Sequence, residues 1–290
     1  MKNNSFQNKI LTALFFTGVT IFFIYYLFPS NYVQNIILDN VSYINPEIEI
    51  RIREVKPVFP PGLRFEKVDL IKNEKNLINA DFIYIYPDYL SFFSAKTIIN
   101  FKCLAYNGKI QGNINIKKNK KSLAITARTK ITDIDLSKIP QITELDGIKI
   151  SGILNGPVNY ELDRRKEEKA LLTLTLSKSK VTFSKPVYSL HEIAFKTVNA
   201  KISIQGKQVN INKCKFYGPY MDGNFSGKLY VRNSIKQSRV NISGSIQPHH
   251  KIIDSVKKVF PVAGIFKKNT MNIKLPFKIK GVIADPKFSF

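Results

Sequence analysis

The chain has 290 residues, of which 44% are hydrophobic and 12% aromatic, so it can bury a core and is not disordered. Its formal net charge is +24 and its pI is near 9.9. Such a balance fits a nucleic-acid binder, a protein that lies on an anionic membrane surface, or a fold whose lysines cover solvated strand faces. Composition alone leaves these three alternatives open, and the N-terminus separates them.

Residues 10–28 form an apolar run without a charged side chain. This length spans a bilayer, and Lys2 and Lys9 precede it without an acidic residue, which predicts a cytoplasmic N-terminus over residues 1–9. A cleaved signal peptide is the alternative, but this apolar core is longer than usual and no A-x-A cleavage site follows it. We therefore expect a transmembrane signal anchor, whose main apolar residues are Ile10, Leu14, Phe15, Phe16, Ile21, Phe22, Phe23, Ile24 and Leu27.

This anchor predicts a protein of the bacterial inner membrane, with residues 29–290 exported to the periplasm. An exported domain does not meet DNA, so we expect the membrane, and no nucleic acid, as a partner. The positive charge would then hold the domain near anionic headgroups.

After the anchor, helical spacing predicts an amphipathic helix over residues 31–43, and a helical turn or two over 88–93. Two further helices are expected over 135–145, interrupted at Pro140, and over 252–260, which Pro261 ends. Between them the apolar residues alternate as in strands, and Asn107-Gly108 predicts a hairpin. The expected strands are residues 47–55, 63–70, 78–86, 98–104, 109–116, 122–131, 148–154, 158–162, 170–176, 181–183, 190–195, 198–205, 209–216, 220–231, 239–246 and 271–279.

One short pattern occurs twice in the chain, which indicates a duplicated β unit over about residues 63–160 and 188–290. Its first copy is Lys102, Cys103, Tyr106, Gly112 and Asn113, and its second copy is Lys213, Cys214, Tyr217, Gly223 and Asn224. The two cysteines could form a disulfide in an oxidising compartment. Because equivalent positions of successive units need not be adjacent, we favour two small, buried apolar side chains.

The number of strands predicts a mainly β fold in which apolar strand faces outnumber the helices that could cover them. About fourteen strands and about four short helices leave two solutions, a sandwich or a curved antiparallel groove that holds an apolar ligand. The clearest alternation ends the chain, with lysine on most of the opposite positions. The candidate core or groove residues are Cys103, Tyr106, Cys214, Tyr217, Met271, Ile273, Leu275, Phe277 and Ile279.

The sequence carries no pattern that predicts catalysis. His249 and His250 could bind a metal, but neighbouring strand residues point to opposite faces and no cysteine or acidic cluster accompanies them, so we expect a loop pair. Nucleophile-elbow, zinc-protease and phosphate-loop motifs are absent from the sequence. We therefore expect a protein that is not an enzyme and holds no metal or cofactor.

Taken together, several weak motifs resemble the type II secretion system protein N (GspN) family, within the wider AsmA-like group. They are the N-terminal anchor, the duplicated unit, Pro60-Pro61-Gly62-Leu63 followed by Phe65, Val68 and Leu70, the helix at Asp135-Leu136 that leads to a glycine-containing strand, and the closing Gly281 and Asp285-Pro286. The resemblance covers nearly the whole chain. It implies an inner-membrane protein whose periplasmic domain is a curved antiparallel β structure with an apolar inner face.

Two functions of different classes follow from these expectations. The resemblance implies a non-enzymatic accessory subunit of the type II protein secretion system, with other secretion-system subunits as partners. The surplus of apolar strand faces favours the alternative, an AsmA-like protein that binds lipid acyl chains and transfers lipid. A stack of fourteen strands at about 4.8 Å reaches only some 65 Å, so docking to other subunits or self-assembly as a homo-oligomer would be needed to span an envelope.

Overall fold

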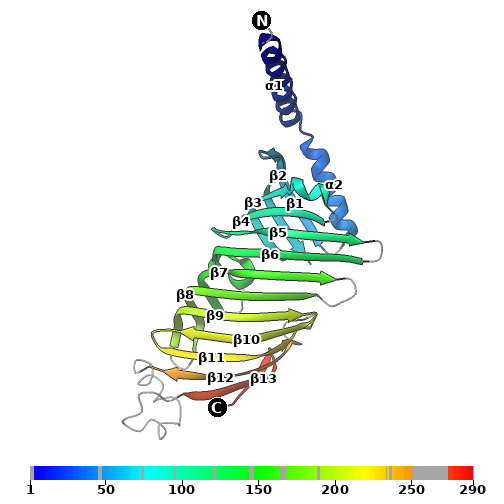
Figure 1. The fold of residues 1–290 in the computed structure, drawn as a ribbon. Coiled ribbons are helices and arrows are strands. Elements are labelled where there is room, and N and C mark those ends of the chain that lie inside the picture. The colour runs from blue at the N-terminus through cyan, green and yellow to red at the C-terminus, as the bar shows by residue number, and fades with distance from the viewer. Residues whose placement is uncertain are drawn as a thin grey trace. The chain divides into compact units, whose positions relative to one another are not determined.

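A computed structural model describes most of the chain (Figure 1). It divides into two compact units, Met1–Tyr86 and Pro87–Phe290, which are described separately below. The described residues are 3–44, 48–72, 75–94, 96–119, 122–143, 147–163, 168–187, 190–232, 234, 237–249 and 274–289. The expected helix over 252–260 and the candidate residues Met271 and Ile273 lie outside them.

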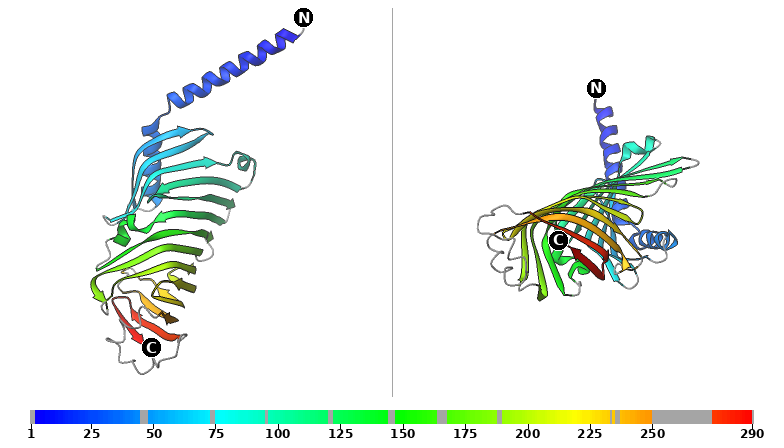
Figure 2. Two further views of the ribbon diagram at one scale, coloured as in Figure 1. Left: turned by 90° about the vertical axis from the view of Figure 1, so that its left-hand side faces the viewer. Right: turned by 90° about the horizontal axis from the view of Figure 1, so that it is seen from below.

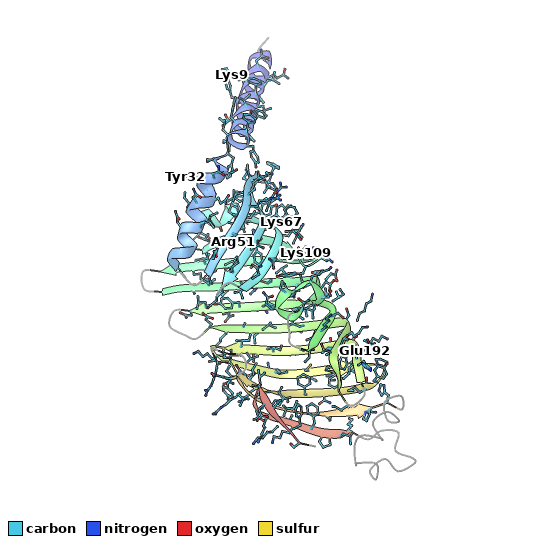
Figure 3. All side chains as sticks on the ribbon, turned by 180° about the vertical axis from the view of Figure 1, so that it is seen from behind. Lys9, Tyr32, Arg51, Lys67, Lys109 and Glu192 are labelled. Atoms are coloured by element: carbon cyan, nitrogen blue, oxygen red, sulfur yellow. The ribbon has the colours of Figure 1, made fainter. Side chains whose placement is uncertain are left out.

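The first unit begins with two helices, α1 (Asn3–Tyr26) and α2 (Ser30–Ile44). The apolar run predicted over residues 10–28 is therefore helical up to Tyr26, and Pro29 directly precedes the second helix, where its carbonyl accepts a hydrogen bond of 3.1 Å from the Val33 amide. Figure 3 labels Lys9 on α1 and Tyr32 on α2. The predicted amphipathic helix over 31–43 is confirmed within α2.

Three antiparallel strands complete the first unit: β1 (Ile48–Val58), β2 (Gly62–Lys72) and β3 (Lys75–Pro87). Helix α2 packs against β1, where the Gln34 Nε2 donates a hydrogen bond of 2.8 Å to the Ile52 carbonyl. At the end of the same strand, the Tyr25 hydroxyl donates one of 2.8 Å to the Val58 carbonyl. The buried apolar side chains of this unit are Ile52, Val55, Phe65, Val68, Ile71 and Ala80.

The second unit is one antiparallel sheet in which the strand order follows the order in the chain. Seen from below, its strands bend and the sheet is curved (Figure 2). Its helical elements are short: η1 (Tyr89–Phe93), η2 (Leu136–Lys138) and α3 (Pro140–Thr143). Its strands are β4 (Lys96–Ala105), β5 (Gly108–Asn119), β6 (Ser122–Asp135), β7 (Ile148–Asp163), β8 (Lys169–Val187), β9 (Leu190–Gln205), β10 (Gln208–Tyr217), β11 (Met221–Tyr230), β12 (Arg239–Pro248), β13 (Leu275–Val282) and β14 (Asp285–Ser289).

The predicted fold class is confirmed: the protein is mainly antiparallel β with a few short helices, preceded by one apolar helix. Of the two solutions expected for the surplus apolar faces, the structure adopts the open sheet, since each unit holds a single sheet layer. The predicted helix over 135–145 is realised as η2 and α3, with the Asp135 carboxylate accepting a hydrogen bond of 3.0 Å from the Ser137 amide as an N-cap.

Several strands are longer than the sequence indicated. Residues 148–154 and 158–162 belong to one strand, β7, which passes through Pro157, and β8 and β9 each likewise join two predicted strands. The apparent breaks are irregularities inside a continuous strand, such as Lys178, whose φ of 50° lies in the left-handed region. Strand β14 was not predicted at all.

The hairpin at Asn107-Gly108 is confirmed, but its turn is placed one residue earlier. The two-residue loop consists of Tyr106 and Asn107, with φ of 51° and 62°, and Gly108 begins β5. Two successive positive φ values match the turn type whose twist suits a tight hairpin. Tyr106 was predicted as a core or groove residue, but the structure places it in the turn and not on a strand, and its side chain is half-buried.

Val55 is the most completely buried large side chain of the first unit, at 0% exposure. We expect Val55→Ala to lower the free energy of unfolding by about 2 kcal/mol, because it leaves a cavity among packed side chains. Chemical denaturation followed by far-ultraviolet circular dichroism measures this. Leu77→Ala serves as the control in the same unit, since Leu77 is 38% exposed and should lose less than about 1 kcal/mol. Equal losses would contradict the packing described here.

Candidate functional site

Strand register assigns every side chain of the second unit to one of two faces. Residues that lie directly opposite each other on antiparallel neighbours point to the same side, and successive residues alternate. Followed strand by strand, this rule separates the described sheet into one face of mostly apolar side chains and one of mostly polar side chains. We call them the apolar face and the polar face.

The apolar face consists of four rows that cross the sheet on successive strands from β4. Neighbours in a row lie directly opposite each other, except that Gly156 lies beside Leu174 and Gly108 beside Ile134 without direct pairing. The first row contains Ile99, Ile114, Ala127, Tyr160, Ala170, Ile204, Val209, Leu229 and Val240. The second contains Phe101, Gly112, Thr129, Val158, Leu172, Ile202, Ile211, Gly227, Ile242 and Ile279. The third contains Cys103, Ile110, Ile131, Gly156, Leu174, Ala200, Cys214, Phe225, Gly244 and Phe277. The fourth contains Ala105, Gly108, Ile134, Leu154, Leu176, Val198, Phe216, Gly223, Ile246 and Leu275.

Two register shifts keep these rows continuous. In β10, Val209 and Ile211 face the apolar side, and the shift after Ile211 brings Cys214 and Phe216 to that side instead of Lys213. In β6, the shift between Ile131 and Ile134 has the same effect. A β-bulge adds one residue to a strand and thereby reverses which alternate positions face the core. The bulges are therefore needed for the apolar surface to run unbroken across the sheet.

Glycines and aromatic rings are interleaved on this face. Gly223 lies opposite Phe216, and a Cβ at Gly223 would come within 2.3 Å of the Phe216 ring. Gly244 lies beside Phe225, whose Cβ would be 2.7 Å from an added Cβ. The absent side chains leave room for the rings to lie flat over the backbone. Gly223, part of the duplicated pattern, thus accommodates a neighbouring ring.

The apolar face is only half covered. Among its described side chains, Ala105, Ile134, Cys214 and Phe216 are buried, while most of the others are intermediate in exposure. The helical elements that contact the sheet in the described part of this unit are η1, η2 and α3, none longer than five residues. Such short elements cannot cover a face of this size, and large exposed apolar patches usually mark binding surfaces.

The polar face carries most of the lysines. Lys109 on β5 is labelled in Figure 3, and the other basic residues of this face include Lys102, Arg128, Lys130, Lys169, Lys201, Lys213, Lys215, Lys228, Lys278, Lys280 and Lys287. Polar contacts join neighbouring strands here. The Thr175 hydroxyl donates to Asn199 Oδ1 at 2.9 Å, and Asn224 Nδ2 donates to Ser245 Oγ at 3.2 Å. The sheet therefore presents an apolar surface on one side and a basic, hydrated one on the other.

The structure places the predicted groove residues in different positions. Cys103, Cys214, Leu275, Phe277 and Ile279 lie on the apolar face, as the rows above show. In contrast, Tyr217 lies on the polar face and is 43% exposed, because it pairs with Thr197 and Asp222 at the end of β10. Sequence reasoning missed the central strands β6 to β9 as part of the surface. Their leucine alternation was visible, but the bulges hide which residues share a face.

The two cysteines share the third row but are far apart. Cys103 is on β4 and Cys214 on β10, so six strand spacings of about 4.8 Å, roughly 29 Å, separate them. Neither cysteine is part of a disulfide. A bond between them would need Cα atoms within about 7 Å. The expectation of two packed thiols is therefore the one that the structure supports, with Cys214 buried at 3% exposure.

Helix α1 supplies the second functional element. It contains a stretch, Gln7–Tyr26, that is long and apolar enough to cross a membrane, with none of it buried against the rest of the protein. The predicted anchor residues are exposed, for example Leu14 at 65% and Phe22 at 62%. An apolar helix whose membrane-length stretch is not buried by the described residues needs apolar surroundings, either as a membrane anchor or as a signal sequence.

A charged cluster in the first unit has a structural explanation. The Glu66 carboxylate, 6% exposed, accepts hydrogen bonds from Arg64 at 2.6 Å, Arg53 at 3.0 Å and Lys56 at 3.4 Å. Burial acts to raise the pKa of Glu66, but the hydrogen bond from Arg53 and the charge of Lys56 outweigh it, and the pKa is lowered. Since the carboxylate is paired on three sides, we assign it to stabilising the strand pair β1–β2.

The described part of the chain gives little support for a metal-binding site. There, no three His, Cys, Asp or Glu side chains gather as ligands would. His249 lies 3.4 Å from the Asp222 carboxylate, and its other ring nitrogen lies 3.4 Å from the Pro219 carbonyl. These contacts hold the loop between β10 and β11 against the end of β12.

Comparison with known proteins gives no identity for the chain. No family model, no curated protein and no solved structure matches it. The resemblance to the secretion-system family therefore stays a prediction, and function has to be argued from the apolar face and the N-terminal helix.

Burial raises the pKa of the Cys214 thiol to about 11. In a Cys103→Ala variant we expect Cys214 to react with iodoacetamide at pH 8 about a hundredfold more slowly in the folded protein than in urea, because the thiolate fraction falls tenfold for each pKa unit. Mass spectrometry of the alkylated protein measures both rates. Because the folded state holds this proton more tightly, the free energy of unfolding should also fall as pH rises from about 9 through 11. Equal alkylation rates would contradict the burial.

Proposed function

We propose that this protein is a membrane-anchored, non-enzymatic protein of the bacterial envelope that binds lipid acyl chains along the apolar face of its second unit. In this proposal α1 lies in the inner membrane and the two β units lie in the periplasm. The proposal rests on one observation above all, the four continuous apolar rows that run from β4 to β13 without a covering layer in the described residues.

The energetics favour a long apolar ligand over a compact one. Each methylene removed from water contributes about 0.8 kcal/mol, so an acyl chain that buries about ten of them gains about 8 kcal/mol before the cost of immobilisation. The rows are continuous, so a flexible chain can lie across several strands and lose little when it slides from one to the next. This property suits transfer of lipid as well as storage.

The geometry also provides a place for the polar headgroup of a bound lipid. A lipid on the apolar face leaves its headgroup at the rim of the sheet, beside a face rich in lysine. Anionic headgroups are attracted to such a surface, and the attraction weakens as salt concentration rises. The high net positive charge of the chain then serves a lipid-binding protein rather than a nucleic-acid binder.

Adjacent residues in β8 offer a direct test. Leu174 lies in the third apolar row and is half-buried, whereas Thr173 lies on the polar face and is exposed. We expect a photo-reactive benzoylphenylalanine placed at Leu174 of the full chain to form lipid adducts in living cells, and the same group at Thr173 to form at least about tenfold fewer. Mass spectrometry of the purified, irradiated protein identifies the adducts. Equal lipid labelling at both positions, or none at Leu174, would refute acyl binding on this face.

A second candidate function is the accessory subunit of the type II protein secretion system. The favouring observation is that β14, as described, pairs with β13 alone and so presents an open strand edge to which another subunit could add a strand. If this function holds, deletion of the gene should reduce export of a secreted hydrolase, and restoring the gene should recover it. Unchanged export would argue against this candidate, and a protein adduct at Leu174 in place of lipid would favour it.

A further inference from the structure

A hollow of about 910 Å³ lies at the end of strands β11 to β14, and of the residues in the four apolar rows it contacts Val240. Its charged lining consists of Arg232, Arg239, Lys280, Lys287 and Asp285. Four positive groups thus face one negative group. In the described residues, no carboxylate forms an ion pair with any of the four.

The register forces these charges together. Lys280 on β13 lies directly opposite Lys287 on β14, and Asn241 on β12 lies opposite Lys280 from the other side. Two residues further along the same strand pair, Arg239 lies opposite Val282. Like charges on directly opposed strand positions destabilise a sheet unless something neutralises them. A bound anion would do so.

Opposed lysines alone do not make a site in this protein. Lys201 and Lys213 also face each other, on β9 and β10, without a flanking arginine. The hollow differs because two guanidinium groups stand beside its lysine pair. Guanidinium groups bind phosphate oxygens through paired hydrogen bonds, whereas an ammonium acts as a point charge.

The backbone at Arg232 is held in place by a buried serine. The hydroxyl of Ser238, 1% exposed, accepts a hydrogen bond of 3.0 Å from the Arg232 amide, and its carbonyl accepts one of 2.9 Å from the Ile283 amide. The neighbouring Val231 amide donates to the Lys207 carbonyl at 2.9 Å. The backbone beneath Arg232 is therefore fixed to two turns of the sheet, which reduces the ordering cost of binding.

We infer that this hollow binds a phosphate-bearing anion, either a soluble phosphate compound or the phosphate of a lipid headgroup. Its charged groups are polar-face side chains together with Arg232, and binding of an anion to them does not require acyl binding on the opposite face. It gives a common ligand to Arg239, Lys280 and Lys287, which form no ion pair with a described carboxylate.

Charge-removing variants test the inference on the full chain in neutral detergent. The hollow variant is Arg239→Gln with Lys280→Gln, and the matched control is Lys201→Gln with Lys213→Gln, which removes the same charge from opposed strands elsewhere. Isothermal titration calorimetry with inorganic pyrophosphate measures binding of a soluble phosphate. We expect the hollow variant to bind at least about tenfold more weakly than the unaltered chain and the control to change less than about twofold.

A second arm uses micelles doped with phosphatidylglycerol or with phosphatidylcholine, and identifies the source of the phosphate. Loss of phosphatidylglycerol preference in the hollow variant alone assigns a headgroup site, and pyrophosphate binding without that preference assigns a soluble ligand. Equal weakening of both variants, or no binding of either probe, would overturn the inference. Circular dichroism confirms that each variant is folded. Lipid adducts at Leu174 report on the acyl face separately, so failure of one proposal leaves the other standing.

Discussion

The structure of the second unit depends on one constraint: the antiparallel hydrogen-bond ladder must keep the apolar side chains of every strand in phase. Successive residues of a strand point to opposite faces, so a single extra residue would move every later side chain of that strand to the wrong face. In β10 the bulge after Ile211 prevents this, because it returns Cys214 and Phe216 to the apolar side while Lys213 points to water. The four rows exist only because such corrections are placed where the pattern would otherwise fail.

The same constraint explains why the fold leaves an apolar surface open. Strands that follow one another in sheet order pair their backbone groups well, but each strand has at most two neighbours, and the described residues form no second layer. The helical elements described in this unit are at most five residues long and cannot supply that layer. Stability then comes from contacts within the face, such as Phe216 over Gly223, and the remaining apolar area is available to a ligand or a partner.

Charge is distributed according to the two faces. The polar face carries many lysines, and the repulsion between them is strongest where register places two of them directly opposite each other, as at Lys280 and Lys287. In the first unit, by contrast, three basic side chains share an acidic partner, since all three donate hydrogen bonds to the Glu66 carboxylate. The charged side chains around Glu66 therefore stabilise a strand pair, whereas the opposed lysines of the polar face are, in our proposal, neutralised by an external anion.

The sequence by itself determined the fold class, the apolar N-terminal helix and the alternation of β13, because each depends on local spacing that a reader of the chain can count. It also indicated Cys103 and Cys214 as packed side chains. Only the tertiary structure decided that both lie in one row, that Tyr106 turns a hairpin and that Tyr217 points to water. Bulges and register are set by pairing between strands, and the sequence of one strand does not show which residues it pairs with. The surface, its two faces and the hollow at β14 therefore emerge only when the strands are assembled.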